Sequence, residues 1–500
     1  MKKILLALGA TLAISSFAGA QKYIGSPAQD LFDQATFFLE TQYFGPSKVN
    51  LGELIAKYQA ELDKSCESAQ KDCGFAVAEP ILAQMFDDLE DPHAYYQSAA
   101  ARRAEQQQAT GTVNTPTPRM GFSHGAFAEY QKQIVTVGGI TQGLLDLVEK
   151  GEVKFLSFDR IILNVVSGSP AEKAGFRYGD RWIGYNGTLF SSFGNIKEYG
   201  EFLAALTPKI QAREKVTFNF LRGPNKTPVN IEAVGEIINV APFPTLSIDE
   251  NNIAHLRISD YLVQGLGQQV HNLVKTAIDK NVKAIIVNMR GNGGGLGSER
   301  LISMGAFIDK PEPMRRVPRY NPERNTTEEV WLNDTGVYAV RNLQGAELSR
   351  ITVRNPVLYK GPMAVLVDEN CASACEYFAS GVQRAKRGPV LGVPTVGIGD
   401  TNSARFGLAN GGAAAMPTVR AFWPDGTPLP SRITPDVSTP DAQYKLFDTG
   451  RDIGVEGALE ALGIKLSSQK SSELLRAPAQ PKVPTWGVYE ARQFKQPANY

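Results

Sequence analysis

The sequence is poor in the residues that build metal sites, and its charges nearly cancel. Its 500 residues include four histidines and four cysteines, and no histidine lies at zinc-ligand spacing from a cysteine pair. There are 52 lysines and arginines against 51 aspartates and glutamates, so the basic surface that binds nucleic acid is missing. Beyond the first 20 residues no apolar run is long enough to cross a bilayer. We therefore expect no zinc site, no nucleic acid partner and no membrane span in the mature chain.

The first 20 residues have the pattern of a secretory signal peptide. Lys2 and Lys3 are followed by an apolar stretch to Phe17 and by the small residues Ala-Gly-Ala, which together predict cleavage before Gln21. An uncleaved anchor is the alternative. No cysteine follows the apolar stretch, which argues against a lipoprotein anchor. We expect an exported protein of the periplasm, the cell envelope or the medium.

The four cysteines form two close pairs. Cys66 and Cys73 bracket a polar turn, ESAQKD, and export permits a disulfide there. Cys371 and Cys375 lie four residues apart, within disulfide range on one helical face. For this second pair we favour two free thiols that fill a tight core as small apolar groups.

The chain divides into five stretches by composition and periodicity. Residues 1–20 are the signal peptide, and residues 21–119 show helical apolar spacing that ends in a polar Gln/Thr/Pro-rich linker. Residues 120–236 are rich in short alternating strands, and residues 237–447 alternate strands with helices, as in an α/β domain. Residues 448–500 hold one helix, VEGALEALG, and a Pro-rich tail.

Residues 120–236 resemble a PDZ domain. The resemblance rests on GSPAEKAG, which gives a turn and a helix start, and on YGDRWIGYNG, which gives a turn, a strand and an Asn-Gly hairpin. It implies that an extended chain end with a free carboxylate binds at a sheet edge. Gly138, Gly139 and Gly143 are the candidates for the carboxylate loop, and a β domain that serves only as a spacer is the alternative.

Four segments of residues 237–447 resemble the carboxyl-terminal (tail-specific) processing serine proteases. They are IAHLRISDY, VNMRGNGGG, VDENCASACEYFA and TVRAFWPDGTPLPSRITPDV, and their order and spacing carry the resemblance. It implies an α/β fold with a crotonase/ClpP-like core, an inserted PDZ-like β domain and an N-terminal helical domain. It also implies peptide or protein substrates with free C-termini and no cofactor.

By this resemblance Ser373 is the nucleophile, and the N–H of Ala374 is one oxyanion donor. Ser373 sits between small residues where a strand passes into a helix, and a helix start offers N–H groups to a developing negative charge. A plain helix N-cap serine is the alternative.

The glycine run RGNGGG follows a buried strand and can bring its backbone close to a ligand. By resemblance Gly294, or its neighbour Gly293, is the second oxyanion donor, and Arg290 and Asn292 brace the loop. An ordinary tight turn is the alternative.

The family's lysine base is missing. The family pattern T-x-G-K-G-x-x-Q falls on residues 395–402, where Ile398 replaces the lysine and Asn402 replaces the glutamine. Isoleucine cannot accept the serine proton, and a serine without a base is a weak nucleophile. The related tricorn-like proteases use a histidine in L-x-D-x-H, which matches His93 here, although lysine-dependent members keep this segment for structure. Asp400 is a poor base unless its pKa is raised.

Two functions follow from this pattern. The first is an exported serine endopeptidase that cleaves protein C-terminal tails, with Ser373, Ala374, Gly294 and, as candidate base, His93. The alternative is a pseudoprotease that binds chain ends or scaffolds an envelope complex, and Ile398 is the residue that favours it.

Overall fold

The computed structural model describes two compact units of the chain. It covers residues 25–464, apart from residues 104–116, 131, 141, 167, 239–242, 310, 313, 320–326 and 333–335. The first unit holds residues up to 102 together with residues 405–416, and the second holds residues 103–404 and the chain from 417 onward. The expected signal peptide, the middle of the expected linker and the Pro-rich tail lie outside the described residues.

Three helices and one short strand build the first unit. They are α1 (Pro27–Gln42), α2 (Leu51–Cys66), α3 (Phe75–Asp87) and β1 (Tyr95–Gln97), with a 3-10 turn at Gln70–Asp72. Ser26 caps α1 by accepting a hydrogen bond from the Gln29 N–H, and Pro27 occupies the first turn, where its missing N–H costs nothing. β1 pairs antiparallel with residues 413–415. A segment that lies some 300 residues further along the chain thus completes the N-terminal unit.

A disulfide joins Cys66 and Cys73, with their Cα atoms 5.5 Å apart, and the prediction for this pair is confirmed. Both cysteines are buried in the core of the first unit. The Cys73 carbonyl also accepts a hydrogen bond from the Ala28 N–H at 3.0 Å. The bridge therefore fixes the turn between α2 and α3 against the start of α1.

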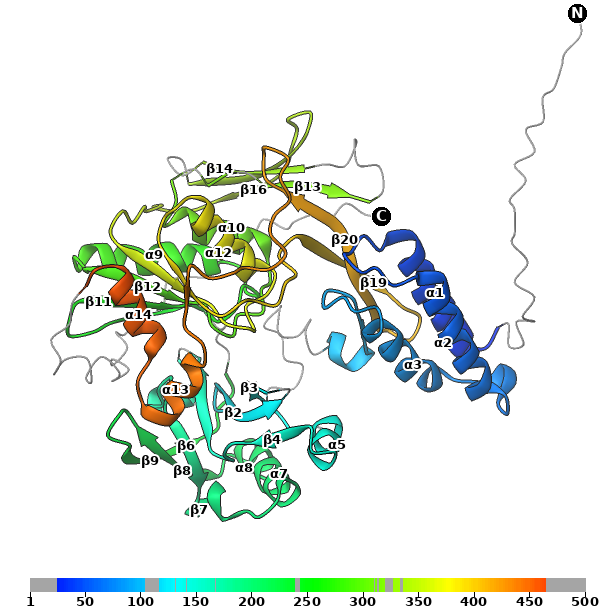
Figure 1. Cartoon of the computed structure of the whole chain (residues 1–500), viewed down its shortest axis with the longest axis horizontal. Coiled ribbons are helices and arrows are strands. Elements are labelled where there is room, and N and C mark those ends of the chain that lie inside the picture. Colours follow the sequence, from blue (N-terminus) through cyan, green and yellow to red (C-terminus); the bar gives the residue numbers. More distant parts are fainter. Residues whose placement is uncertain are drawn as a thin grey trace, which may run out of the picture. The chain divides into compact units, whose positions relative to one another are not determined.

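A six-stranded sheet with helices on both faces forms the centre of the second unit (Figure 1). Its strands, in spatial order, are β10 (Thr245–Ile248), β11 (Ile253–Arg257), β12 (Ala284–Asn288), β17 (Met363–Leu366), β18 (Val390–Gly392) and β21 (Val437–Ser438). All neighbours are parallel except β10 and β11. β12 is apolar on both faces, as expected for a strand buried in a parallel sheet.

Alternate residues of β12 point to opposite faces of the sheet and pack in two different hydrophobic cores. Ile285 and Val287 face α9 (Leu266–Asp279), α10 (Gly297–Gly305) and α12 (Ala374–Arg384). Ala284 and Ile286 face α14 (Ile453–Ala461). Figure 1 shows the first three helices gathered on one side of the sheet and α14 on the other. The α/β arrangement predicted for this region is confirmed.

Antiparallel strands form a separate sheet in the same unit. They are β13 (Arg315–Pro318), β14 (Thr327–Leu332), β15 (Val337–Asn342), β16 (Glu347–Thr352) and the later part of β20 (Ala413–Phe422). The sequences TNSARFGL and MPTVRAFW form strands β19 (Thr401–Gly407) and β20, as predicted. They lie outside the parallel sheet, however, and β20 pairs antiparallel with β13.

Residues 119–236 fold into a third, antiparallel sheet that is closed by a bridge between Arg119 and Glu236. Its path is β3 (Gln133–Val137), β2 (Phe122–Tyr130), β5 (Arg160–Val165), β6 (Arg181–Tyr185), β8 (Lys215–Arg222) and β9 (Thr227–Val234), with β4 (Val153–Phe155) and β7 (Thr188–Leu189) at the side. Its helices are α5 (Gln142–Glu149), α6 (Pro170–Ala174), α7 (Ile196–Ala204) and α8 (Leu206–Gln211), with a 3-10 turn at Phe190–Ser192. Asn186 and Gly187 both have positive φ angles, as a tight hairpin turn requires.

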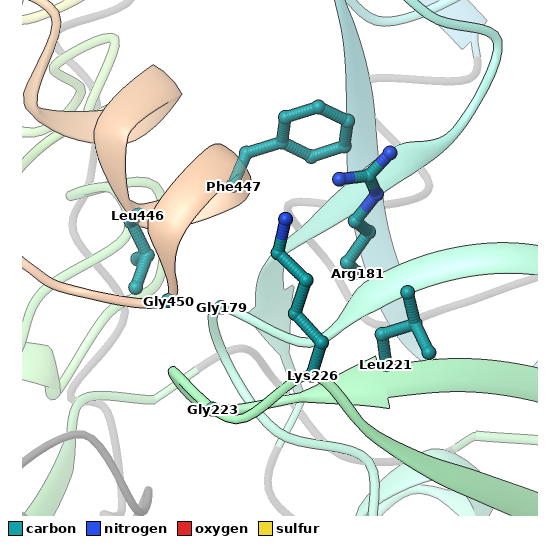
Figure 2. A pocket seen from close by; sticks show the side chains of 8 residues that line it. All are labelled: Gly179, Arg181, Leu221, Gly223, Lys226, Leu446, Phe447 and Gly450. Carbon is teal, nitrogen blue, oxygen red and sulfur yellow. The ribbon is translucent and has the colours of Figure 1, made fainter. Parts of the chain in front are cut away.

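Helix α13 (Ala442–Thr449) packs on one face of this third sheet. Leu446 and Phe447 join Phe127 and Ile161 in a small core, and the Arg181 guanidinium lies 4.3 Å from the centre of the Phe447 ring. A shallow hollow remains at the edge of this contact (Figure 2). It is lined by Gly179, Arg181, Leu221, Gly223, Lys226, Leu446, Phe447 and Gly450. The segment of α13 thus covers part of the sheet formed by residues 119–236.

Within the described ranges, no helix combines the length and the apolar character that a bilayer crossing needs.

We expect Cys66 and Cys73 to resist alkylation in denatured, unreduced protein and to react after reduction. The Cys66→Ser/Cys73→Ser variant should unfold at lower temperature, because closing a loop of this size contributes about 2–3 kcal/mol in the chain-entropy description. Peptide mapping and thermal unfolding measure the two effects. Free thiols at both positions in freshly isolated protein would contradict the assignment.

Candidate active site

Ser373 stands where the loop after β17 turns into α12. Its φ of 52° and ψ of −113° lie in a region that residues with a side chain rarely adopt. Ser373 is the N-cap residue of α12, although its backbone differs from the extended conformation that N-cap serines normally have. From Cys371 to Val382, Ser373 is the only residue that is not buried. The backbone turn therefore presents the Ser373 side chain from an otherwise buried segment.

A disulfide joins Cys371 and Cys375 on either side of Ser373, with their Cα atoms 5.5 Å apart. Our interpretation of these residues as two free thiols was wrong. Both side chains are fully buried in the main core of the second unit. The sequence spacing allowed both states, and only the backbone turn between residues 371 and 375 brings the two side chains together. The bridge closes a five-residue loop with Ser373 at its centre.

The glycine loop after β12 lies directly against Ser373. A Cβ atom at Gly294 would lie 2.9 Å from Ser373 Cβ and 3.0 Å from the Ala374 nitrogen. Gly294 also has a φ of 95°, so both the space and the backbone require glycine. The sequence placed this loop and Ser373 about 80 residues apart, and the fold brings them into contact.

Two N–H groups, of Ala374 and of Gly293 in the glycine loop, have no acceptor among the described residues. Ala374 is the first residue of α12, so its N–H has no acceptor within the helix. No described residue accepts a hydrogen bond from the Gly293 N–H, and Gly293 is exposed. The Gly294 N–H instead donates to Asn292 Oδ1 at 2.8 Å. The Gly294 N–H is therefore already paired, and the choice between Gly293 and Gly294 as the second donor stays a prediction.

Buried side chains hold the glycine loop in place, and the prediction that Asn292 and Arg290 brace it is confirmed. Asn292 donates to the Ile258 carbonyl at 3.1 Å, and its own carbonyl accepts from the Ala372 N–H at 3.0 Å. Arg290 forms two hydrogen bonds, of 2.9 and 2.7 Å, to Asp452 at the start of α14.

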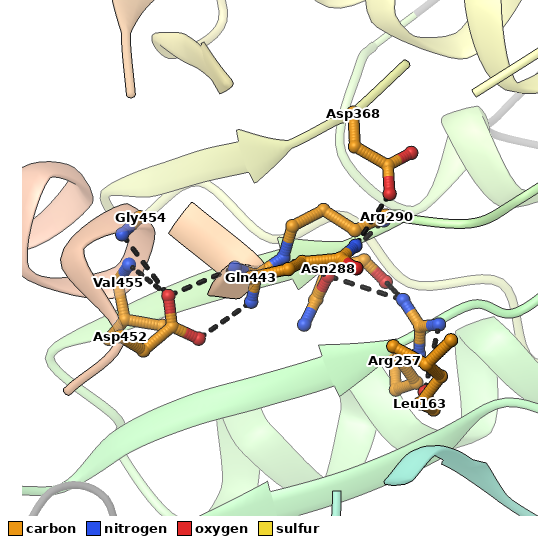
Figure 3. Close-up of polar contacts among 9 residues, drawn as sticks. All are labelled: Leu163, Arg257, Asn288, Arg290, Asp368, Gln443, Asp452, Gly454 and Val455. Carbon is orange, nitrogen blue, oxygen red and sulfur yellow. Dashed lines mark hydrogen bonds and ion pairs between the residues drawn. The ribbon is translucent and has the colours of Figure 1, made fainter. Parts of the chain in front are cut away.

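Figure 3 shows how this support extends beyond the ion pair. Asn288 accepts hydrogen bonds from the side chains of Arg290 and Arg257. Asp368 accepts from the Gly291 N–H at 2.8 Å and from Gln443 at 2.6 Å. The loop is therefore anchored by strands, by α14 and by the segment of α13.

Glu376 connects Ser373 to the loop of residues 395–399, and its side chain is almost fully buried. Its two carboxylate oxygens accept four hydrogen bonds, from Ser373 N at 2.8 Å, Thr395 Oγ1 at 2.6 Å, Gly397 N at 2.7 Å and Ile398 N at 3.1 Å. Burial raises the pKa of Glu376, while these donors favour the ionised form. One carboxylate thus positions both the turn at Ser373 and the backbone of residues 395–398.

Ile398 is buried, with 7% of its surface exposed. Its backbone is held by Glu376, and its neighbour Gly399 donates to the Ser431 carbonyl at 2.7 Å. Gly397 has a φ of 102°, and a Cβ there would lie 3.0 Å from Arg432 Nε. The Thr-x-Gly-x-Gly frame is therefore intact around a side chain that cannot take a proton.

The histidines of the second unit have structural partners. His124 Nδ1 accepts from Arg160 at 2.6 Å, and His255 lies 3.1 Å from Asp249. His271 binds two backbone groups, the Ile302 carbonyl at 3.0 Å and the Val357 N–H at 3.1 Å. Burial lowers the pKa of His271 to about 4. None of these contacts involves Ser373.

His93 belongs to the first unit, within the turn that follows α3. Asp91 accepts a hydrogen bond from the His93 N–H at 2.9 Å and another from the Tyr43 hydroxyl at 2.8 Å. Burial and the contact with Asp91 raise the pKa of Tyr43. The segment therefore has a structural role inside its own unit, and the role of His93 as a base stays a prediction.

Sequence reasoning missed Glu376, Asp452 and Asp368. The Ser373-x-x-Glu376 spacing is that of a helix capping box, so this signal was available. The Asp452 partner of Arg290 lies 162 residues away along the chain, and no local pattern marks it.

Comparisons with known proteins point to one family. Residues 252–439 match the model of peptidase family S41. The carboxy-terminal processing protease CtpA of Bacillus subtilis is 24% identical over 347 residues, which cover 66% of each chain. The carboxyl-terminal-processing protease of a Synechocystis strain is 23% identical over 62% of this chain and 67% of its own length. The alignments thus span about two thirds of these curated relatives.

A solved structure shares the fold. The crystal structure of an S41 protease from Bacteroides fragilis superimposes with a TM-score of 0.50 at 11% identity, covering 86% of this chain and 97% of that chain. At this identity the likeness concerns the fold alone.

We expect Glu376→Gln to lower the free energy of unfolding by about 2–6 kcal/mol. The amide keeps one acceptor oxygen and turns an NH₂ group toward buried donors, and each unsatisfied buried group costs roughly 1–3 kcal/mol. Chemical denaturation measures the change. Glu347→Gln is the matched control, because Glu347 pairs with Arg350 at the surface, where ion pairs contribute little. Equal effects of the two substitutions would contradict the role of Glu376.

Asp452→Asn should destabilise the second unit by about 3–5 kcal/mol, because Arg290 is left buried without its counter-ion. Burial alone would raise the pKa of Asp452, but Arg290 lowers it below its ordinary value. The stability from this pair is therefore present above the ordinary aspartate pKa of about 3.9 and is lost as pH falls below it. Unfolding measured from pH 3 to 7 should show the difference between wild type and variant shrinking only in acid. Glu456→Gln, which breaks the exposed pair with Arg451, should show a much smaller difference.

Proposed function

Residues 252–439 carry a domain of peptidase family S41, and on that premise we propose that the chain is an exported serine endopeptidase that cleaves protein C-terminal tails at Ser373. The observation that carries the proposal is the strained turn at Ser373. It places the one residue of segment 371–382 that is not buried at the first N–H of α12 and against the glycine loop at Gly294.

The reaction follows from these groups. Ser373 Oγ attacks the carbonyl carbon of the scissile peptide, and the carbonyl oxygen becomes an oxyanion held by the Ala374 and Gly293 N–H groups. The C–N bond then breaks, the amine leaves with a proton, and an ester to Ser373 remains. Water attacks this ester through a second oxyanion and releases the new C-terminus.

A general base is needed both to form and to hydrolyse the ester. At the position where the family pattern has its lysine base, this chain has Ile398. Losing a triad-type base costs on the order of a million-fold in turnover and leaves oxyanion and binding effects. His93 is the candidate replacement. We therefore assign a low turnover to the protein, and the second candidate function is a peptide-binding pseudoprotease, which the buried Ile398 favours.

The substrates in this proposal are polypeptides with a free C-terminal carboxylate. The PDZ-like region of residues 120–236 selects them by adding an extended chain end to a sheet edge. The N-terminal signal pattern places the reaction outside the cytoplasm. Relatives named as carboxyl-terminal processing proteases support this substrate class.

We expect purified mature protein to cleave a reporter with an unstructured apolar tail slowly or not at all, and Ile398→Lys to raise the rate. The position is buried, and burial lowers a lysine pKa toward the neutral form that accepts a proton. Ile398→Met is the matched control, since it keeps an apolar side chain of similar size. Adding Asn402→Gln restores the family's other missing residue.

Cleavage in each case should disappear in Ser373→Ala. If Ile398→Lys and its double variant remain as slow as Ile398→Met, the assignment of position 398 as the base position is wrong. Rapid cleavage by the unmodified protein that is lost in both Ser373→Ala and a folded His93→Ala would replace the low-turnover assignment with a histidine-based site.

A further inference from the structure

One edge of strand β2 is covered by a segment of the same chain. Ala128 of β2 pairs with Phe155 of β4 on one side and with Val135 of β3 on the other. β3 runs antiparallel to β2, from the pair Tyr130/Gln133 to the pair Ala126/Val137. The chain then continues through Gly138 and Gly139 to Ile140. An extended peptide that adds a strand to an edge takes this kind of position.

Residues 134–140, here called the inner segment, end on an apolar anchor. Ile140 packs against the main core of the PDZ-like region, as does Phe122 at the start of β2. A Cβ atom at Gly200 in α7 would lie 3.3 Å from Ile140 Cγ2, so the glycine gives the isoleucine room. The inner segment thus pairs with a strand through its backbone and places its last apolar side chain against a helix.

The Arg160 side chain binds the inner segment through backbone carbonyls. Its guanidinium is fully buried and donates to the carbonyls of Val137, at 3.0 Å, and Gly138. The same group donates to His124 of β2 at 2.6 Å and to the Tyr199 hydroxyl of α7 at 2.9 Å. One side chain therefore connects the strand, the helix and the inner segment. Burial, with the charge of Arg160, lowers the pKa of His124 to about 3, so this histidine stays neutral and can accept.

Close packing at Gly125 shows how tightly the inner segment lies on β2. A Cβ atom at Gly125 would meet Thr136 Cγ2 at 2.4 Å. The backbone pairing, the apolar anchor and the Arg160 contacts all hold the inner segment against β2.

We propose that the inner segment is a built-in ligand of the β2 edge, which a protein C-terminus must displace before it binds. This inference rests on the proposed function, because it concerns how substrate tails gain access. The external ligand that fits is an extended peptide with an apolar last residue. A tethered competitor acts at an effective concentration in the millimolar range, and the apparent affinity for an external peptide falls by the fraction of open edge.

The probe is a fluorescent peptide with the sequence of residues 133–140, ending in isoleucine with a free carboxylate, and its amidated twin. All variants carry Ser373→Ala, so that the peptide is not cleaved. Ile140→Asn removes the apolar anchor and should tighten binding of the free-carboxylate peptide at least tenfold. Leu156→Asn, directly after β4, is the matched control, because Leu156 is exposed, and it should leave the affinity unchanged.

A disulfide can lock the inner segment in place. The Cβ positions at Gly200 and Ile140 are 3.8 Å apart, the mean separation in disulfides. The Ile140→Cys/Gly200→Cys variant, with the new bond verified by mass spectrometry, should lose peptide binding at least tenfold and regain it on reduction. The parent protein with the same reductant controls for the two native disulfides.

A locked variant that binds the peptide as well as its parent would overturn the proposal, as would equal effects of Ile140→Asn and Leu156→Asn. If no variant binds either peptide, the proposal that this region recognises chain ends is wrong. Hydrogen exchange then tests separately whether the inner segment is a built-in ligand. Slow exchange of the amides of residues 134–137 that becomes fast in Ile140→Asn supports the built-in ligand. Fast exchange in the parent protein overturns it.

Discussion

The carboxylate of Glu376 is the constraint on which the candidate site depends. It accepts four hydrogen bonds from two segments that are separated along the chain, the turn at Ser373 and residues 395–398. A buried carboxylate without partners would be costly, so its four donors must be delivered together. Satisfying one buried charge therefore fixes the backbone of Ser373 in a rarely adopted conformation and holds Ile398 beside the same helix start.

The glycine loop is supported from a greater distance. Arg290 reaches Asp452 in a fully buried ion pair, and such pairs are destabilising unless their geometry and hydrogen bonds are complete. Here Asn288 and the start of α14 complete them. The C-terminal helices thus do more than cover a sheet face, because they hold the loop that contacts Ser373. The disulfide around Ser373 adds a covalent limit to the same turn.

The site is complete in its backbone and incomplete in its proton chemistry. Ser373 is accessible at a helix start, and the loop of residues 395–399 keeps its threonine and glycines. The buried side chain of that loop at position 398 is isoleucine, which cannot exchange a proton. In the proposal made above, this combination gives a low turnover.

Several strands, turns and helix starts, and one disulfide, could be predicted from local sequence patterns. The continuous apolar run of β12 predicted a strand buried on both faces, and alternation predicted β8 and β9. The Asn-Gly turn, the helix start at Pro170 and the Cys66–Cys73 bridge were also predicted. These features depend on residues within a few positions of one another, so the sequence alone determines them. The order of the motifs also indicated the resemblance to the processing proteases, which the family match over residues 252–439 supports.

Only the tertiary structure decided which distant segments meet. It paired Arg290 with Asp452, placed residues 405–416 with the N-terminal helices and bridged Cys371 to Cys375. It also laid residues 134–140 along β2. Each of these outcomes depends on burial and on the completion of hydrogen bonds between segments, and neither is encoded in the spacing of neighbouring residues. The sequence gives the identity of residue 398, but only the fold buries its side chain and brings its backbone to Glu376.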